Sequence, residues 1–308
     1  MTQFLRNLKF NILKNILVIG GGGYTGGVVV PQLISNGWNV KIYDTFWYGK
    51  NHLPKSSNLK LIEGDVRNIK KFTSCLKDIN YVLHLACISN DASFELDTKL
   101  SRTVNYESFE PIVIACKKNG VKRFVFASTS SVYGISDKKE IKEDHPLVPI
   151  TAYNKFKGMC EPLLLKHTDQ NFTGVIFRPA TVCGYSSRQR LDVIVNILSN
   201  LAYHKREITV FGGSQLRPNI HITDMIRVYE ILIESNSNNV NGEIFNAGWQ
   251  NQTVNEIALT VKKTIGSDVQ IIKSKTDDNR SYHISSGKIK EKLNFQTKFT
   301  IENAVEDL

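Results

Sequence analysis

The stretch that most constrains this 308-residue chain is ILVIGGGGYTG at residues 16–26, where four glycines follow a short apolar run. The apolar run has the length and composition of a buried strand. Gly20, Gly23 and Gly26 then give G-x-x-G-x-x-G at a strand-to-helix turn. Such a turn lets a ligand approach the backbone, and its N–H groups and helix dipole favour a pyrophosphate. The glycines alone leave a plain tight turn as the alternative.

Short apolar segments alternate with segments of helical period over the first 180 residues. The segments predicted as strands are 15–20, 38–44, 59–65, 81–86, 123–128 and 172–179. The segments predicted as helices are 28–37, 67–77, 107–120 and 151–167. This alternation predicts an α/β fold with a parallel sheet covered on both faces.

The pattern becomes irregular after residue 180. The elements expected there are a helix at 190–204, a strand at 206–213, a helix at 224–235 and a polar loop at 235–242. No low-complexity linker separates the two parts of the chain. The sequence therefore predicts a first domain at 1–180, to which later segments return, and a smaller lobe formed mainly by 181–308.

An acidic residue ends the second predicted strand. The Asp44 carboxylate can accept hydrogen bonds from both hydroxyls of an adenosine ribose and would repel a 2′-phosphate, which favours NAD over NADP. Asp65 ends the third strand segment and is a candidate for contact with the adenine, although a lone acid there is more often a helix N-cap. Strand, glycines, helix, second strand and terminal acid together predict an NAD site.

A second cluster of polar residues follows the fifth predicted strand. Residues 128–134 read STSSVYG, and Tyr153 and Lys157 lie at the start of the next predicted helix. These two residues are i and i+4, so they share one helix face. An ammonium group beside a phenol favours the phenolate, which would let Tyr153 act as a general base. Thr129 is placed to hydrogen-bond the same substrate hydroxyl. In isolation, the Tyr–Lys pair is equally compatible with an exposed helix surface.

Composition excludes several other classes of protein. The net charge is +10, but the lysines are scattered in pairs rather than clustered with aromatic residues, so a nucleic-acid partner is not expected. The five cysteines show no metal-ligand spacing and are expected to be free thiols of a cytoplasmic protein. No apolar run is long enough to cross a bilayer, so no membrane association is expected. The first ten residues are interpreted as a short leader before the first strand.

The chain resembles the extended short-chain dehydrogenase/reductases, specifically the NAD-dependent epimerase/dehydratase group that acts on nucleotide sugars. The resemblance covers essentially the whole length. It rests on GGGGYTG, Asp44, EGDVRN, HLA at 84–86, STSSVYG, YNKFK, RPATVCG at 178–184 and GGSQLRPNIHITD at 212–224. It implies a Rossmann-type doubly wound parallel sheet with a smaller C-terminal substrate-binding lobe. It also implies NAD as the cofactor and a homodimer formed through a helix pair.

The resemblance assigns roles to the catalytic and cofactor residues. Thr129 matches the active-site serine or threonine, Tyr153 the base, and Lys157 the partner that also holds the nicotinamide ribose. The residues expected at the cofactor, besides Tyr153 and Lys157, are Gly20, Gly23, Tyr24, Thr25, Gly26, Asp44, Asp65, Val66, Leu85, Ala86, Pro179 and Thr181.

The substrate residues are expected at three places in the chain. Ser89, Asn90, Ser93, Thr129 and Ser130 are candidates for the sugar. The resemblance assigns Asn196, Arg217 and Arg280 to the nucleotide and its diphosphate, and Arg188 and Arg190 are further candidates because guanidinium groups suit a pyrophosphate. Each arginine could instead pair with a nearby acid, such as Asp192, Asp277 or Asp278. His221 is interpreted as a buried structural histidine.

The sequence predicts a reaction at C4 of a nucleotide-diphosphate sugar. Tyr153 takes the proton of the C4 hydroxyl while hydride passes to NAD⁺, which gives a 4-keto sugar. Ser130 and Ser131 stand where sugar dehydratases of the family carry Asp-Glu, so a 4,6-dehydratase is not expected. A 4-epimerase, in the setting of polysaccharide biosynthesis, is the favoured outcome. A C4 dehydrogenase and a 4-ketosugar reductase are the alternatives, and a non-catalytic NAD-binding protein is less favoured.

Overall fold

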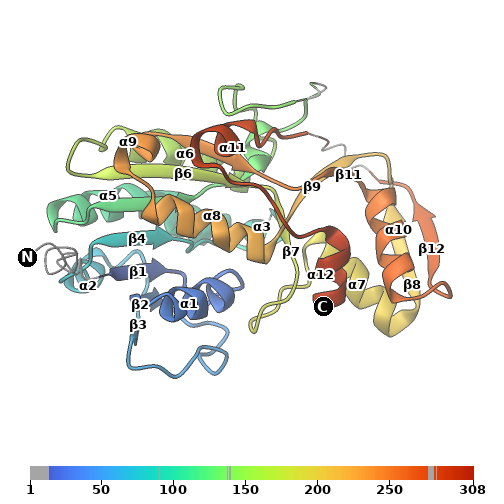
Figure 1. Ribbon diagram of the computed structural model, residues 1–308, viewed down its shortest axis with the longest axis horizontal. Coiled ribbons are helices and arrows are strands. Elements are labelled where there is room, and N and C mark those ends of the chain that lie inside the picture. Colours follow the sequence, from blue (N-terminus) through green and yellow to red (C-terminus); the bar gives the residue numbers. More distant parts are fainter. Residues whose placement is uncertain (1–13, 90, 137, 139, 277–280, 282) are drawn as a thin grey trace, which may run out of the picture.

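The centre of the molecule is a seven-stranded parallel sheet with the strand order β10-β6-β5-β4-β1-β2-β3 (Figure 1). The structure is a computed structural model that describes residues 14–89, 91–136, 138, 140–276, 281 and 283–308. The leader expected over the first ten residues lies outside them. The strands are β1 (Asn15–Ile19), β2 (Asn39–Asp44), β3 (Leu59–Glu63), β4 (Tyr81–His84), β5 (Arg123–Ala127), β6 (Thr173–Pro179) and β10 (Ile244–Ala247). All six predicted strands are present, which confirms the doubly wound α/β fold.

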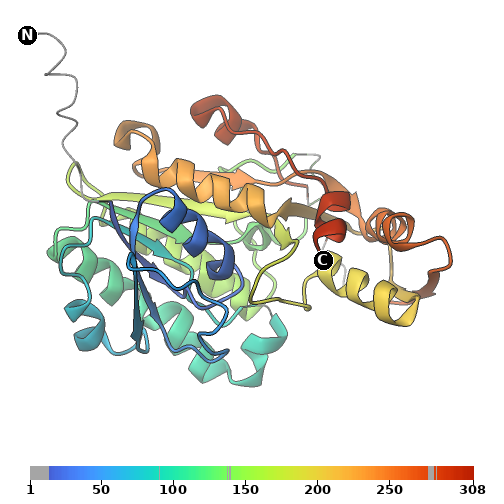
Figure 2. The same ribbon diagram turned by 60° about the horizontal axis from the view of Figure 1, so that its bottom comes forward.

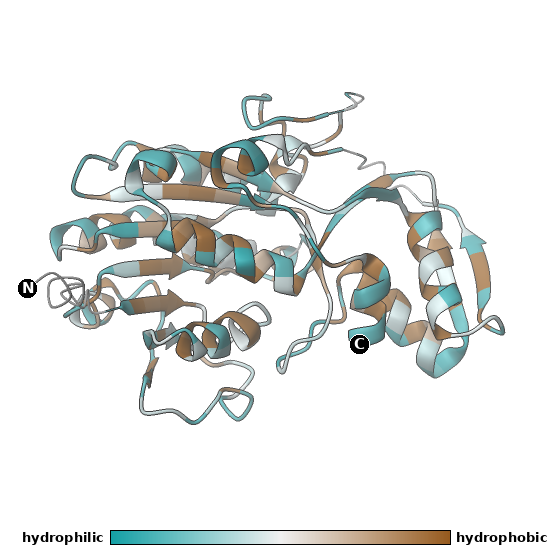
Figure 3. Ribbon diagram, in the orientation of Figure 1, coloured by the Kyte–Doolittle hydropathy of each residue, from teal (hydrophilic) through white to brown (hydrophobic). Residues whose placement is uncertain are grey.

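Both faces of this sheet are buried, which explains why its strands read as continuous apolar runs. Successive side chains of a strand point to opposite faces. In β1, Ile16 and Val18 therefore join one hydrophobic cluster, while Leu17 and Ile19 join the other. Figure 3 shows the central strands as mostly hydrophobic ribbon between helices of mixed character.

Helices from distant parts of the chain cover the two faces. The cluster on one face draws on α1 (Gly26–Ser35), α8 (Ile222–Glu234) and α11 (Gly287–Leu293). The cluster on the other face draws on α2 (Ile69–Ser74), α5 (Phe109–Lys118) and α6 (Ala152–Leu165). Late segments of the chain thus return to the sheet that the first half builds. No helix among the described residues is both long and apolar enough to span a membrane.

The segments between β4 and β6 carry several short elements that the sequence pattern did not reveal. They are α3 (Asp91–Leu96), α4 (Thr98–Arg102), a π-helical turn (Thr103–Glu107) and a 3-10 turn (Ser130–Tyr133). The loop predicted at 235–242 contains the short helix α9 (Ser237–Val240), because the Asn236 side chain caps its start by accepting from the Asn238 N–H.

A smaller group of elements lies beyond the end of the sheet (Figures 1 and 2). Its hydrophobic cluster includes residues of α7 (Ile194–Lys205), β8 (Glu207–Phe211), α10 (Val254–Ile265) and α12 (Ile301–Asp307). The remaining strands are β7 (Thr181–Cys183), β9 (Leu216–His221), β11 (Asn251–Thr253) and β12 (Gln270–Ser274). Helix α7 begins later than the predicted residue 190, since the preceding residues form the cavity wall described below.

The close packing of the glycine turn on α1 gives a stability prediction. A Cβ built on Gly26 would lie 2.1 Å from the Gly21 carbonyl oxygen. We expect Gly26→Ala to lower the free energy of unfolding by about 1–3 kcal/mol, because the turn must move away from the helix. The matched control is Gly158→Ala inside α6, where a Cβ comes no closer than 3.4 Å to Leu147.

Urea denaturation of the two variants tests this packing. The control should match the parent or gain slightly, because alanine favours a helix interior. An unchanged midpoint for Gly26→Ala would show that the turn has room that the structure does not show.

Candidate active site

One large cavity opens along the carboxyl edge of the central sheet, where ligands bind in folds of this class. Its volume is about 1190 Å³, above the range of roughly 300–1,000 Å³ that is common for a single small-molecule pocket. It brings together most of the predicted site. The predicted residues on its wall are Gly20, Gly23, Tyr24, Thr25, Asp44, Asp65, Val66, Leu85, Ala86, Ser89, Ser93, Thr129, Tyr153, Lys157, Pro179, Thr181, Arg188, Arg190 and Arg217.

Three predicted site residues are not on this wall. Asn196 is fully buried: its Oδ1 accepts from the Gly184 N–H at 3.0 Å and its Nδ2 donates to the Arg190 carbonyl at 2.9 Å. Ser130 is buried by the 3-10 turn, and Gly26 packs on Gly21. Their assignment to the ligand site stays a prediction, because the structure places them behind the cavity wall. The predicted residues Asn90 and Arg280 lie outside the described residues.

The glycine turn has the shape that a bound dinucleotide requires. Gly20 has a φ of +82°, and a Cβ on it would lie 2.5 Å from the Ala86 nitrogen. A Cβ on Gly23 would meet only the Gly20 carbonyl oxygen within 4 Å, so this side of the turn is open. Bare backbone at the start of a helix, on a cavity wall, suits a diphosphate.

The Asp44 carboxylate lies at the same end of the cavity. Its Oδ2 accepts from the Gly22 N–H at 2.8 Å and its Oδ1 accepts from the Phe46 N–H at 2.7 Å. Each oxygen keeps a second lone pair for a ribose hydroxyl. Asp65 is held differently: Arg67 pairs with it at 2.6 Å and lowers its pKa, so its carboxylate is already engaged. The residues present therefore fit an adenosine diphosphate moiety, and the Asp44 carboxylate has free lone pairs at this end of the cavity.

Lys157 lies one helical turn after Tyr153 on α6, as predicted. Its ammonium group is buried, donates to the Ala127 carbonyl at 2.7 Å and lies 4.9 Å from the centre of the Phe126 ring. These contacts hold the start of α6 against the end of β5. The ammonium group therefore bonds to the strand in this structure.

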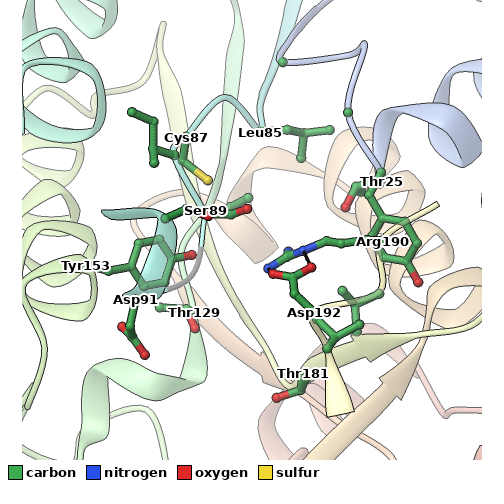
Figure 4. A pocket seen from close by; sticks show the side chains of 18 of the residues that line it. Thr25, Leu85, Cys87, Ser89, Asp91, Thr129, Tyr153, Thr181, Arg190 and Asp192 are labelled. Carbon is green, nitrogen blue, oxygen red and sulfur yellow. Dashed lines mark hydrogen bonds and ion pairs between the residues drawn. The ribbon is translucent and has the colours of Figure 1, made fainter. Parts of the chain in front are cut away.

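The electrostatic surroundings of Tyr153 differ from the expectation. Burial is the largest effect and raises its pKa well above the usual value; Cys87 and Asp91 raise it further. Arg190 lowers it. Figure 4 shows the Tyr153 hydroxyl and the Arg190 guanidinium directed toward each other across the cavity. Arg190 is thus a cation near the phenol that the sequence did not indicate, and the role predicted for Lys157 stays a prediction.

Arg190 is held in place by the acid two residues later. Its Nε donates to Asp192 Oδ1 at 2.7 Å and its second terminal nitrogen donates to Oδ2 at 2.9 Å (Figure 4). Such a two-point pair keeps the guanidinium plane in one orientation. Arg190 therefore pairs with a nearby acid, which was the alternative to a substrate contact. Both residues of the pair also line the cavity. Asp277 and Asp278 lie outside the described residues.

A chain of hydroxyl groups surrounds Thr129. The Thr129 and Ser131 hydroxyl oxygens lie 2.7 Å apart, and the Ser131 hydroxyl donates to Asn154 Oδ1 at 2.5 Å. Since the Ser131 proton is directed to Asn154, the Thr129 proton is directed to Ser131. The Thr129 oxygen also accepts from the Ser131 N–H at 3.2 Å, so both hydrogen bonds tie it to Ser131 in this structure.

Beneath these residues, a buried ion pair ties α6 to the sheet. Glu161 accepts from Arg178 at 2.9 and 2.5 Å and from the Ser128 hydroxyl at 2.6 Å. Arg178 also donates to the Tyr133 hydroxyl at 2.7 Å. Tyr153, Lys157 and Glu161 follow each other at intervals of four residues, so one helix face carries all three.

Several residues of the cavity wall were not predicted from the sequence. They are Trp47, Tyr48, Cys87, Asp91 and Ser131. Cys87 directly follows the HLA segment and Ser131 lies two residues after Thr129, so proximity to a recognised motif was the available signal. His221 was interpreted correctly: it is buried and accepts from the Thr223 N–H at the start of α8.

Comparison with known proteins agrees with this geometry. The chain is 26% identical over 275 residues to a UDP-glucose 4-epimerase of Lactobacillus helveticus, with 82% of each chain covered. A solved UDP-glucose 4-epimerase of Thermotoga maritima superposes with a TM-score of 0.86 at 26% identity, covering 95% of this chain and 96% of that one. A UDP-glucuronic acid 4-epimerase of Bacillus cereus, solved with UDP-glucuronic acid and NAD, gives a TM-score of 0.85 at 26% identity over 95% and 97% of the two chains.

The family assignment rests on most of the chain. The model described as the NAD dependent epimerase/dehydratase family matches residues 16–248, a span that contains the glycine turn, Asp44, Thr129, Tyr153 and Lys157. The chain belongs to the NAD dependent epimerase/dehydratase family.

Proposed function

We propose that this protein is an NAD-dependent 4-epimerase of a nucleoside-diphosphate sugar. The observation that carries the proposal is the meeting of Thr129, Tyr153 and Lys157 with the open glycine turn in one cavity. A cavity of about 1190 Å³ suits a dinucleotide and a sugar nucleotide side by side. The similar proteins named above favour UDP sugars as the first substrates to test.

The cofactor half of the cavity would be formed by the first strands of the sheet. We propose that Gly20 and Gly23 approach the diphosphate, that Asp44 accepts from the adenosine ribose and that Lys157 donates to the nicotinamide ribose. NAD⁺, when bound, would supply the acceptor for the hydride of the sugar C4 and, once reduced, the donor for the reverse transfer. The other expected contacts are Leu85, Ala86, Pro179 and Thr181, all of which line the same cavity.

Tyr153 would handle the proton of the C4 hydroxyl. The phenolate accepts this proton when the alcohol is oxidised and returns it when the ketone is reduced. When the sugar binds, the Thr129 hydroxyl would turn its proton from the Ser131 oxygen to the C4 oxygen, because the single proton of the C4 hydroxyl goes to Tyr153. Together the two side chains hold the C4 oxygen during both halves of the reaction.

The residues beside Thr129 favour epimerisation over elimination. Removing the C6 hydroxyl of a hexose needs an acid to protonate the leaving group. Ser130 is buried and Ser131 already donates to Asn154. Neither position carries an acid, so the 4-keto sugar is expected to be reduced again, with inversion at C4.

Three finer expectations stay predictions. They are the homodimer, the cytoplasmic location and the setting in polysaccharide biosynthesis. The division at residue 180 stays a prediction as well, although β10 and α8 do return to the large sheet.

Removal of the Tyr153 hydroxyl tests its role as the base. We expect Tyr153→Phe to bind NAD⁺ normally but to lose about 10²- to 10⁴-fold in the rate of C4 oxidation, since proton transfer is lost while the ring remains. Tyr203→Phe, at an exposed tyrosine outside the cavity, is the matched control. The measurement is the initial rate of C4 inversion; near-parental turnover of Tyr153→Phe would contradict the assignment.

The pKa of Tyr153 gives a pH prediction. Because burial, Cys87 and Asp91 raise this pKa, the phenolate fraction and the rate should increase with pH through the neutral and alkaline range. Replacing Cys87 with alanine removes one raising influence, so the rising limb should move to lower pH. Cys116→Ala, at a buried thiol outside the cavity, should leave the profile unchanged. If the rising part of the pH–rate profile stays in place or moves to higher pH in Cys87→Ala, then Cys87 does not raise the pKa of Tyr153.

A further inference from the structure

Arg188, a candidate for the substrate diphosphate from the sequence, lies beside the glycine turn in the structure. The loop that carries it packs on the start of α1. A Cβ built on Gly27 would lie 2.6 Å from Ser186 Oγ and 3.4 Å from the Arg188 nitrogen, and Ser186 Oγ donates to the Tyr24 carbonyl at 2.7 Å. The Arg188 backbone is therefore anchored beside the glycine turn.

The Arg188 side chain reaches across the cavity to the loop after β2. Its guanidinium carbon lies 3.5 Å from the centre of the Tyr48 ring, the distance of a stacked cation–π contact. Tyr48 is 66% exposed, so burial alone does not hold its ring there. Both residues line the cavity that also contains Asp44 and Gly23. The stack thus joins two walls of the cavity near the glycine turn.

The charge of Arg188 is not balanced by an acid among the described residues. One terminal nitrogen donates to the Gln189 carbonyl at 2.8 Å, and the plane of the group rests on Tyr48. A neutral carbonyl leaves the positive charge available to an anion. The open side of the glycine turn is where a diphosphate would bring two negative charges.

We propose that Arg188 and Tyr48 form a clasp over the dinucleotide diphosphate that slows release of the cofactor. The proposal rests on the NAD binding that the proposed function requires. An epimerase must keep its reduced cofactor bound between two hydride transfers. An arginine stacked across the opening would attract the diphosphate and would also cover it. Arginine suits this role better than lysine, because only its planar group can stack flat on the ring while it contacts a diphosphate.

Cofactor binding in the absence of any sugar tests the clasp. NADH fluorescence gives the dissociation constant and, on dilution, the release rate. We expect Arg188→Ala and Tyr48→Ala each to weaken binding about tenfold, the scale of one charge-assisted contact. The double variant should be little weaker than either single one, since both substitutions break the same contact. Tyr48→Phe should bind as the parent does.

The control variants change the same residue types elsewhere. Arg206→Ala removes an arginine that pairs with Asp268 outside the cavity, and Tyr203→Ala removes an exposed ring. Both should leave cofactor binding unchanged.

The possible results separate this proposal from the proposed function. Parental NADH binding by Arg188→Ala overturns the clasp while leaving the epimerase proposal in place. The same holds if that variant binds NADH normally but shows a raised KM for the sugar nucleotide, which would return Arg188 to the substrate diphosphate. A parent protein that binds no NADH overturns both proposals. A further result would support the clasp and refute the epimerase. In it, the parent binds NADH, Arg188→Ala and Tyr48→Ala bind it more weakly, and the parent inverts no sugar at C4.

Discussion

The buried ion pair between Glu161 and Arg178 is the interaction on which the geometry of the site depends. Removing both charges from water is costly, and the cost is offset only when every oxygen and N–H group finds a partner. Ser128, Tyr133 and the Glu143 carbonyl oxygen supply further partners, so α6, β5 and β6 meet in one arrangement. Tyr153 projects into the cavity two turns earlier on the same helix. The position of Tyr153, the proposed base, is thus supported by a charge pair that lies outside the cavity wall.

The order of strands and helices could be predicted because it is written in local patterns. Apolar runs such as Ile16–Ile19 are buried on both faces, and the glycines after β1 leave few alternatives to a tight turn into a helix. Most predicted residues at the edge of the sheet therefore line one cavity. The short helices over 91–102 were missed, since the apolar residues of DASFELDTKLSR are spaced by two or four positions and show no clear helical period.

The direction of individual side chains could not be predicted in the same way. Whether Ser130 or Ser131 faces the cavity depends on a 3-10 turn, which rotates consecutive residues differently from a strand. The Asn196 side chain forms hydrogen bonds to the Gly184 N–H and the Arg190 carbonyl. The loop that carries these backbone groups has no recognisable sequence pattern. The pKa of Tyr153 depends on Cys87 and Arg190, which come from segments far apart in the chain. Such convergence is a property of the tertiary structure.

The central claim is that the 4-keto sugar stays bound and is reduced again within the same cavity. The most direct test incubates the purified protein and NAD⁺ with a panel of UDP, GDP and dTDP sugars, following nicotinamide absorbance and the NMR spectrum of the product together. We predict a sugar inverted at C4 with no net NADH. Accumulation of NADH with a released 4-keto sugar would contradict it and would identify a C4 dehydrogenase.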